Sequence, residues 1–533
     1  LNHIYRDRAL FVTGASGFVG KVLVEKMLHS LPGIKTIFIL IRASKGKSGT
    51  ERWKDIEKLE LFNRIRRDCP DRLSKVVAIE GDITLSDLGI SQENMQRVLE
   101  ETSVVIHCAA TVRFNEPLKN AVEINMRGVS RVISLCHRMP KLACFLHCST
   151  CYVNADKLGI PVEERVYPAL CDPHKLMEAS DWLDDSLFES IGESASKVYT
   201  NTYCFTKALS EHLVLDEASN LPTLILRPAI VGGIWKDGIP GWADAFQGIA
   251  ALLAALGSGA ISRVPVDLNS RCDAIPVDIV TNMMISAGAY RIMLKDSTIP
   301  ILHCNSSDLN PMRFGDVRNH VVECAMKYPM DSVVSTPIFS PFGSDRLEKS
   351  MHSVREKYIG PAMDRITSIA GKKPFWARFY GRVGETYTVI RKFLVDYHFK
   401  SDNLVQLLKM MTEEDRETFD FDIRKLNWFD YMFDVQMGVK VFLLKDNIVD
   451  HEKVRNARRK MQLMQFTFTW TSVLEKNDNC LCIFRSMTSW HIFVPLTLVW
   501  HFYCTIFTYT PCGVASIHEY KRRIEDAMGE TLK

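Results

Sequence analysis

Short apolar runs alternate with helical patterns along residues 1–230 of the chain. Six of these runs are rich in Val, Ile, Leu and Phe and are too short for buried helices, so they predict buried strands. They cover residues 9–13, 36–41, 76–80, 104–110, 144–150 and 223–228. Residues with helical spacing, among them Val19, Val22, Leu23 and Met27, follow the first run at once. Strands that alternate with helices predict an α/β fold, a doubly wound parallel sheet of the Rossmann type.

The pattern changes in the later part of the chain. A polar, acidic insertion occupies residues 158–197, and from about residue 345 charged helical stretches replace the strands. We therefore predict a dinucleotide-binding domain at 1–344 and a mainly helical domain at 345–450 that lies over the substrate side. A third region, 451–533, begins with a basic run.

The third region contains a long uncharged segment. Residues 486–517 include no Asp, Glu, Lys or Arg, and the apolar part at 490–509 has about the length that a helix needs to cross a bilayer. Trp490 and Tyr503 are aromatic residues of the type found at membrane interfaces, and Pro495 would kink the helix. We predict one membrane span near 490–509; a buried hairpin in a soluble domain is the alternative. Basic residues lie on both sides, so charge leaves the orientation open.

Three glycines follow the first predicted strand. Gly14, Gly17 and Gly20 have the spacing G-x-x-G-x-x-G between that strand and the first helix. Gly14 allows the tight turn, Gly17 lets backbone N–H groups approach a pyrophosphate, and Gly20 lets the helix lie close to the strand. Phosphates would lie at the helix N-terminus, where free N–H groups and the helix dipole favour anions. The context predicts a dinucleotide site, although a glycine turn can also simply join a strand to a helix.

Arg42 ends the second predicted strand, 22 residues after Gly20. This fold places the residue that reads the ribose there, and a guanidinium suits the 2′-phosphate of NADP, whereas an acid would suit NAD. A solvated basic loop is the alternative, because Lys45, Lys47 and Arg52 are close in sequence. Asp82, after the third strand, either binds the adenine amino group or caps the next segment.

Hydroxyl, phenol and ammonium groups follow the fifth predicted strand. This strand ends in Ser149 and Thr150, and Tyr203 and Lys207 lie four residues apart on one helix face. Hydride addition to a carbonyl leaves charge on oxygen, and Tyr203 could donate the proton, with Lys207 stabilising the phenolate. Ser149 or Thr150 could hold the carbonyl oxygen. His107 lies in an apolar run, which favours a core histidine over an acid–base group.

Composition narrows the functional classes. The chain has 533 residues, 47% hydrophobic and 24% charged, and a net charge of +3, so a large core is expected and nucleic acid is not the expected partner. The 15 cysteines are scattered, which indicates free thiols in a reducing compartment. Cys148 and Cys151 form a C-x-x-C without a second pair at zinc-finger spacing, so we expect no metal site.

These motifs resemble a known family. TGASGFVG, HCAATVRF, the Ser149–Thr150 strand end and YCFTK are similar to those of extended short-chain dehydrogenases/reductases. Residues 4–450 resemble the animal fatty acyl-CoA reductases, with VIHCAATVRFNEPL at 105–118, RPAIVGG at 227–233, and a block at 421–446 similar to the C-terminal male sterility domain. The motif alignment implies that Thr150 is the active hydroxyl. Cys151 departs from the family, which usually has a small residue there.

The resemblance implies the reaction and its place. A long-chain acyl-CoA would take two hydrides from NADPH, through an aldehyde, to give a primary fatty alcohol for ether lipid or wax synthesis. The protein would be a single-pass, tail-anchored protein of the peroxisomal membrane with its catalytic domains in the cytosol, and the endoplasmic reticulum is the alternative. The apolar segment 248–256 would line an acyl tunnel or form a core helix. We expect the cofactor to contact Gly14, Ser16, Gly17, Phe18, Gly20, Arg42, Asp82, Ile83, Ala109, Ala110, Lys207, Arg227 and Pro228.

Two other functions fit parts of the sequence. A membrane-bound sterol or sugar-nucleotide dehydrogenase would share the pattern up to Arg227, but the C-terminal block argues against it. A catalytically silent lipid-binding scaffold would not need Gly14, Tyr203 and Lys207, which are all present. The sequence determines neither the oligomeric state nor the preferred chain length.

Overall fold

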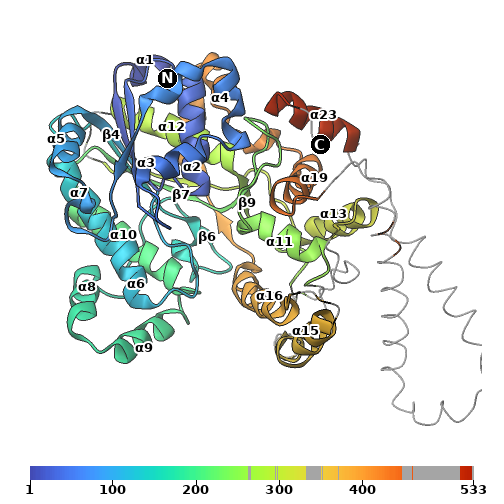
Figure 1. Ribbon diagram of the computed structural model, residues 1–533. Coiled ribbons are helices and arrows are strands. Elements are labelled where there is room, and N and C mark those ends of the chain that lie inside the picture. The colour runs from blue at the N-terminus through green and yellow to red at the C-terminus, as the bar shows by residue number, and fades with distance from the viewer. Residues whose placement is uncertain are drawn as a thin grey trace, which may run out of the picture.

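The structure is a computed structural model that describes residues 1–331, 350–446 and 517–530, except the single positions 262, 263, 265, 295, 297, 351, 370 and 372, together with residues 456 and 459. A parallel sheet of seven strands, in the order β10-β7-β5-β4-β1-β2-β3, forms its centre (Figure 1). The sheet confirms the predicted fold class. Its strands are β1 Ala9–Thr13, β2 Thr36–Ile41, β3 Val76–Glu80, β4 Thr102–His107, β5 Cys144–Cys148, β7 Thr223–Pro228 and β10 Ile301–Cys304.

The strand bounds differ from the prediction at two places. β4 ends at His107 and β5 at Cys148, whereas the apolar runs continue to residues 110 and 150. The residues just after β4 lie against the glycine turn, since a Cβ on Gly14 would lie 2.7 Å from the Ala109 amide nitrogen. The sequence also missed β10, which pairs with the end of β7 and is only four residues long.

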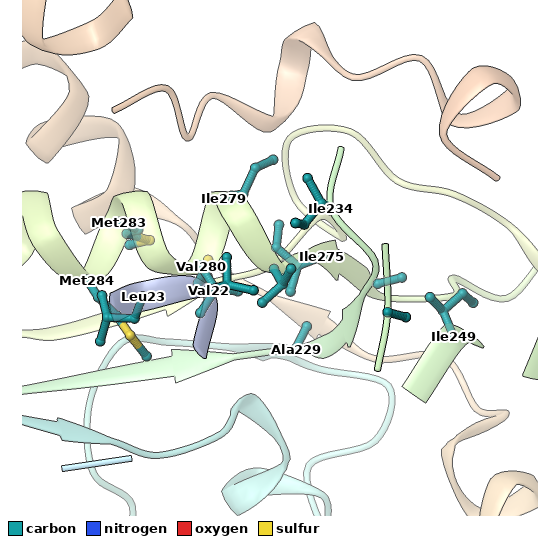
Figure 2. Close-up of a cluster of buried hydrophobic side chains, with 14 of the residues drawn as sticks. Val22, Leu23, Ala229, Ile234, Ile249, Ile275, Ile279, Val280, Met283 and Met284 are labelled. Carbon is teal, nitrogen blue, oxygen red and sulfur yellow. The ribbon is translucent and has the colours of Figure 1, made fainter. Parts of the chain in front are cut away.

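Alternate side chains of each strand point to opposite faces of the sheet, as the pleat requires. Leu10 and Val12 belong to a core on one face, and Phe11 belongs to a second core on the other. Helices α2, Phe18–Ser30, and α12, Val277–Met293, cover the first face. Figure 2 shows Val22 and Leu23 of α2 next to Met283 and Met284 of α12 in this core. Both faces are buried, which is why the strands read as continuous apolar runs.

Further helices surround the sheet. The second face carries α5, Gln92–Glu101, and α7, Gly128–His137. Apart from short 3-10 helices, the other helices described in the first 330 residues are α1 Asn2–Tyr5, α3 Gly49–Ile56, α4 Asn63–Asp68, α6 Leu118–Val122, the π-helix η4 Glu123–Arg127, α8 Pro173–Trp182, α9 Asp185–Ala195, α10 Thr202–Glu217, α11 Gly248–Gly257 and α13 Phe314–Lys327. Two small parallel sheets pair β8, Ile230–Gly232, with β9, Ala274–Pro276, and β6, Pro161–Val162, with β11, His398–Phe399.

The apolar segment at 248–256 forms α11. Ile249, Leu253 and Leu256 are buried, and the helix packs against α13 and α19. This packing is what the core-helix alternative predicts.

The C-terminal region is mainly helical, as expected. Its helices are the π-helix η6 Arg355–Ile359, α15 Gly360–Ile369, α16 Trp376–Ile390, α17 Asp402–Met410, α18 Glu413–Thr418, α19 Trp428–Gly438 and the π-helix η9 Val439–Leu443. The pairing of β11 with β6 joins this region to the acidic insertion.

The last helix, α23 at Ile517–Met528, packs on the body of the molecule (Figure 1). The Tyr520 hydroxyl is buried and donates to the Pro240 carbonyl at 3.1 Å, and the Arg523 guanidinium reaches the Asp434 carboxylate at 2.5 and 2.8 Å. The predicted region 451–533 therefore includes a helix that belongs to the folded body. The expected span at 490–509 lies outside the described residues. Among the helices that the structure describes, none has the length and apolarity to cross a bilayer.

Candidate active site

The glycine turn lies where the strand order reverses, between β1 and β4. Gly14 has a φ of +76°, and a Cβ there would lie 2.7 Å from the Ala109 amide nitrogen. A Cβ on Gly20 would lie 2.2 Å from the Gly14 carbonyl oxygen. These contacts confirm the tight turn and the close helix approach that the sequence predicted. Open α/β sheets bind ligands in the crevice at this reversal.

The first turn of α2 is open to a ligand. Gly17 is the N-cap, and no side chain caps its first amides, whereas Asn201 caps α10 and Ser91 caps α5. Gly17 is exposed and Ser16 half-buried, so the amides face accessible space. Unpaired amides at a helix N-terminus suit a pyrophosphate. The residues present therefore fit a dinucleotide.

Arg42 follows β2 at the same edge of the sheet. Its side chain is 65% exposed, and its guanidinium lies 3.6 Å from the Asp82 carboxylate. Asp82 also accepts hydrogen bonds from the backbone N–H and hydroxyl of Thr84 at 3.0 and 2.9 Å, which are the contacts expected of a cap. Arg42 is thus accessible to a phosphate group.

Tyr203, Lys207 and Thr150 lie together beyond the ends of β4 and β5. The Thr150 hydroxyl lies close enough to the Tyr203 phenol to affect its pKa, and it also donates to the Pro228 carbonyl oxygen at 3.3 Å. Lys207 Nζ donates to the Cys148 carbonyl oxygen at 2.7 Å and lies 3.4 Å from His147 Nε2. Tyr203 and Lys207 lie on one face of α10, and Thr150 follows the end of β5 at the same site.

Burial controls the titration of this cluster. It raises the pKa of Tyr203, and the Thr150 hydroxyl opposes that rise. Burial also lowers the pKa of Lys207, which Cys148 and Glu211 partly restore. The expected lowering of the Tyr203 pKa by Lys207 is not seen, because the ammonium donates to the Cys148 carbonyl. In this arrangement Tyr203 is a protonated phenol that can donate to a nearby oxygen.

A buried ion pair stands beside this cluster. Glu211, one turn after Lys207 on α10, accepts from Arg227 Nε at 2.8 Å and from Nη2 at 2.5 Å, and both side chains are fully buried. The Ser149 hydroxyl donates to the same carboxylate at 2.5 Å. Ser149 therefore serves this network, whereas Thr150 faces Tyr203.

Arg227 was expected to contact the cofactor. Its remaining guanidinium contacts are to His303 Nε2 at 3.1 Å and to the Arg165 carbonyl oxygen at 3.0 Å, and its exposure is 0%. Glu211, His303 and a carbonyl thus use the donors of the Arg227 side chain, and its contact with the cofactor stays a prediction. Sequence reasoning missed Glu211, whose only signal was its helical register with Tyr203 and Lys207.

Two polar residues support the site from within the core. Asn125, in η4, accepts from the Thr111 amide at 2.9 Å and donates to the Thr206 hydroxyl at 3.0 Å, so it holds the backbone just after β4. His107 Nδ1 lies 2.7 Å from the Thr13 hydroxyl oxygen, and burial followed by the Lys207 charge lowers the His107 pKa to about 3. His107 is thus a neutral core histidine.

Aromatic side chains pack against one side of Tyr203. Phe114 packs edge-on against the Tyr203 ring at 5.6 Å, and Phe393, which follows α16, packs against Phe114 at 5.1 Å. Tyr152 lies 4.9 Å from Phe393. Sequence reasoning missed this cluster, because its members lie far apart in the chain. It brings the C-terminal region to the candidate site.

The other predicted contact residues lie at the same edge or beside it. Ala109 and Ala110 are half-buried just beyond β4, Phe18 opens α2 and stacks on Trp242 at 5.9 Å, and the Pro228 carbonyl oxygen accepts from the Thr150 hydroxyl at 3.3 Å. Ile83 is buried, and its carbonyl accepts from Arg131. In the described part of the chain, no three side chains of the metal-binding types gather into a site.

Comparison with known proteins identifies the family. The profiles of the male sterility protein family match residues 12–284 and 357–446. Fatty acyl-CoA reductase 1 of Gallus gallus is 32% identical over 471 residues, which cover 88% of this chain and 91% of that protein. The Xenopus laevis protein of the same name is 33% identical, covering 87% of this chain and 90% of its own.

This chain belongs to the fatty acyl-CoA reductase family. The stated resemblance is therefore confirmed. Among solved structures, the terminal reductase domain of the myxalamid biosynthetic pathway is similar, with a TM-score of 0.56 and 18% identity over 83% of this chain and 91% of that one. A reductase domain of a Mycobacterium tuberculosis non-ribosomal peptide synthetase has a TM-score of 0.51 and 15% identity, over 82% and 92% of the two chains. At these identities the likeness shows the shared fold.

Proposed function

We propose that this protein is an NADPH-dependent fatty acyl-CoA reductase that converts long-chain acyl-CoA to a primary alcohol through an aldehyde. The observation that carries the proposal is the cluster of Tyr203, Thr150 and Lys207 at the edge of the sheet that also holds the open glycine turn. Membership of the family, whose relatives are named as fatty acyl-CoA reductases, gives the substrate class.

The proposed chemistry uses the same groups twice. The glycine turn and the α2 N-terminus would hold NADPH, which would supply the hydride for each reduction. Tyr203 donates the proton to the substrate oxygen, and Thr150 hydrogen-bonds that oxygen. After the first reduction the carbon–sulfur bond breaks, releasing CoA thiol and aldehyde. After the second, the protonated oxygen is the alcohol hydroxyl. Lys207 holds positive charge beside the developing oxyanion.

Arg42 supports the choice of NADPH over NADH. The guanidinium is accessible at the end of β2, where a 2′-phosphate would lie, and it can donate several hydrogen bonds to a phosphate. We further propose that the segment 490–509 attaches the protein to the peroxisomal membrane and that its alcohols enter ether lipids or waxes. Both of these proposals rest on the resemblance and on the apolar sequence of that segment.

The test uses the purified full chain with a series of acyl-CoAs and either NADPH or NADH, and products are identified by mass spectrometry. We expect alcohol from long-chain acyl-CoA, two NADPH oxidised per alcohol, and a trappable aldehyde. The variant Tyr203→Phe is the matched control for background chemistry. Binding of NADPH without reduction of any acyl-CoA would contradict the proposal and favour the scaffold alternative.

A further inference from the structure

Exposed apolar side chains are concentrated in one short part of the C-terminal region. Tyr358 is 70% exposed, Ile369 89% and Phe375 55%, and Val354 and Ile359 are also exposed. All five lie within η6, α15 and the turn before α16 or next to them. Several large exposed apolar side chains on one element can mark a surface that contacts a partner.

These side chains are held on a built helical hairpin. The Asp364 carboxylate of α15 accepts hydrogen bonds from the backbone N–H groups of Phe375, Trp376 and Ala377 at 2.6, 2.7 and 3.0 Å, which fixes the first turn of α16. A Cβ on Gly360 would lie 2.5 Å from the Cα of Ala377, so the two helices lie in close contact. The principal contacts of α15 are with α16 and η6, and the hairpin projects from the body (Figure 1). Its apolar surface is therefore part of a defined element.

The surface of this hairpin is basic. The exposed charged residues of its described part are five basic and two acidic ones: Lys357, Arg365, Lys373, Arg378 and Arg382, against Glu356 and Glu385. Apolar side chains flanked by Lys and Arg favour the headgroup layer of an anionic bilayer, where the apolar groups enter the lipid and the cations meet phosphate.

The other end of the hairpin reaches the candidate active site. Phe393, just after α16, packs against Phe114, which packs against Tyr203. The 15 residues of α16 span about 22 Å at the usual helical rise. The hairpin therefore connects an exposed apolar, basic tip to the surroundings of the catalytic phenol.

We propose that the α15–α16 hairpin docks on an anionic phospholipid bilayer and so holds the active site near the membrane from which apolar acyl substrates arrive. The docking adds to any attachment through the tail, and its link to substrate rests on the proposed function. A bilayer fits better than a protein partner because five of the seven exposed charged residues on the described part of the hairpin are basic.

The test places a photocrosslinker at the tip. The full chain with Ile369→p-benzoylphenylalanine is reconstituted in vesicles of phosphatidylcholine with phosphatidylserine, and adducts are identified by mass after irradiation. Trp182→p-benzoylphenylalanine is the matched control, because Trp182 is 70% exposed but lies among acidic residues at the end of α8. We expect phospholipid adducts at position 369, fewer without phosphatidylserine, and none at position 182. Adducts only to protein, or equal lipid adducts at both positions, would overturn the proposal.

A kinetic measurement supplies an independent readout. Ile369 is almost fully exposed, so Ile369→Glu should fold normally. We expect a several-fold loss of activity on long-chain acyl-CoA presented in vesicles and unchanged activity on a water-soluble short-chain acyl-CoA. Trp182→Glu should change neither. Equal losses of activity on both substrates would contradict docking. Lipid adducts from a protein that reduces no acyl-CoA would refute the proposed function and leave docking supported.

Discussion

Replacing Glu211 by Gln tests how the candidate site is held together. The carboxylate receives Arg227 Nε and Nη2 at 2.8 and 2.5 Å and the Ser149 hydroxyl at 2.5 Å, all without solvent contact. Gln keeps the shape of the side chain but removes its negative charge. The Arg227 guanidinium then remains buried without a counterion. The hydrogen bond from Ser149, just after β5, to the carboxylate on α10 is also weakened.

The size of the effect follows from the burial of the pair. Removing one partner of a buried ion pair typically costs about 3–5 kcal/mol, because the remaining charge is uncompensated. Since the Gln amide oxygen can still accept one hydrogen bond, we expect about 3 kcal/mol for Glu211→Gln. For a domain of about 340 residues this corresponds to a fall in melting temperature of roughly 4 °C. We also expect kcat to fall, because Ser149 precedes Thr150.

The assay is thermal and denaturant unfolding of the full chain, with NADPH binding as a test of the fold. Glu101→Gln is the control, because its ion pair with Lys35, at 2.8 Å, lies on the surface and should be worth less than about 1 kcal/mol. The double variant Glu211→Leu/Arg227→Met removes both charges and should be more stable than Glu211→Gln. If Glu211→Gln is as stable as Glu101→Gln, the reasoning about this network is refuted.

Four further predictions concern the cofactor, the chemistry and, in two cases, the C-terminus. Arg42→Ala should raise the KM for NADPH much more than that for NADH, while Lys47→Ala should change neither; equal effects on both cofactors would refute the 2′-phosphate role. Tyr203→Phe should lower turnover by about 10²–10⁴-fold with NADPH binding retained, because it removes the proton donor; near-normal turnover would mean that another group supplies the proton. Arg523→Ala should lower the melting temperature because it breaks the ion pair of α23 with α19, and the exposed Arg522→Ala should not. Since α23 packs on the catalytic body, an epitope after it should be accessible from the same side of the membrane as that body; an epitope protected in intact vesicles would favour the single-pass topology instead.

The sequence by itself determined most helices and strands, and the residues whose geometry depends only on near neighbours in the chain. Four of the predicted strands have the observed bounds, because strands buried on both faces must be apolar throughout. The positions of Gly14 and Gly20 follow from the backbone geometry of one turn, and helical spacing alone puts Tyr203 and Lys207 on one face. Such features depend on neighbours within a few residues, so a local pattern can reveal them.

Only the tertiary structure decided which distant groups meet. Several contacts join elements whose local sequences do not reveal which partner each will meet. They are Glu211 with Arg227, Phe114 with Tyr203, and α23 with α19. A run of apolar or charged residues specifies burial or exposure, but its partner depends on the packing of the whole chain. For the same reason residue type and spacing did not separate the role of Ser149 from that of Thr150, and only the family resemblance implied Thr150. The two hydroxyls are adjacent at one strand end, and the fold directs one to Glu211 and the other to Tyr203.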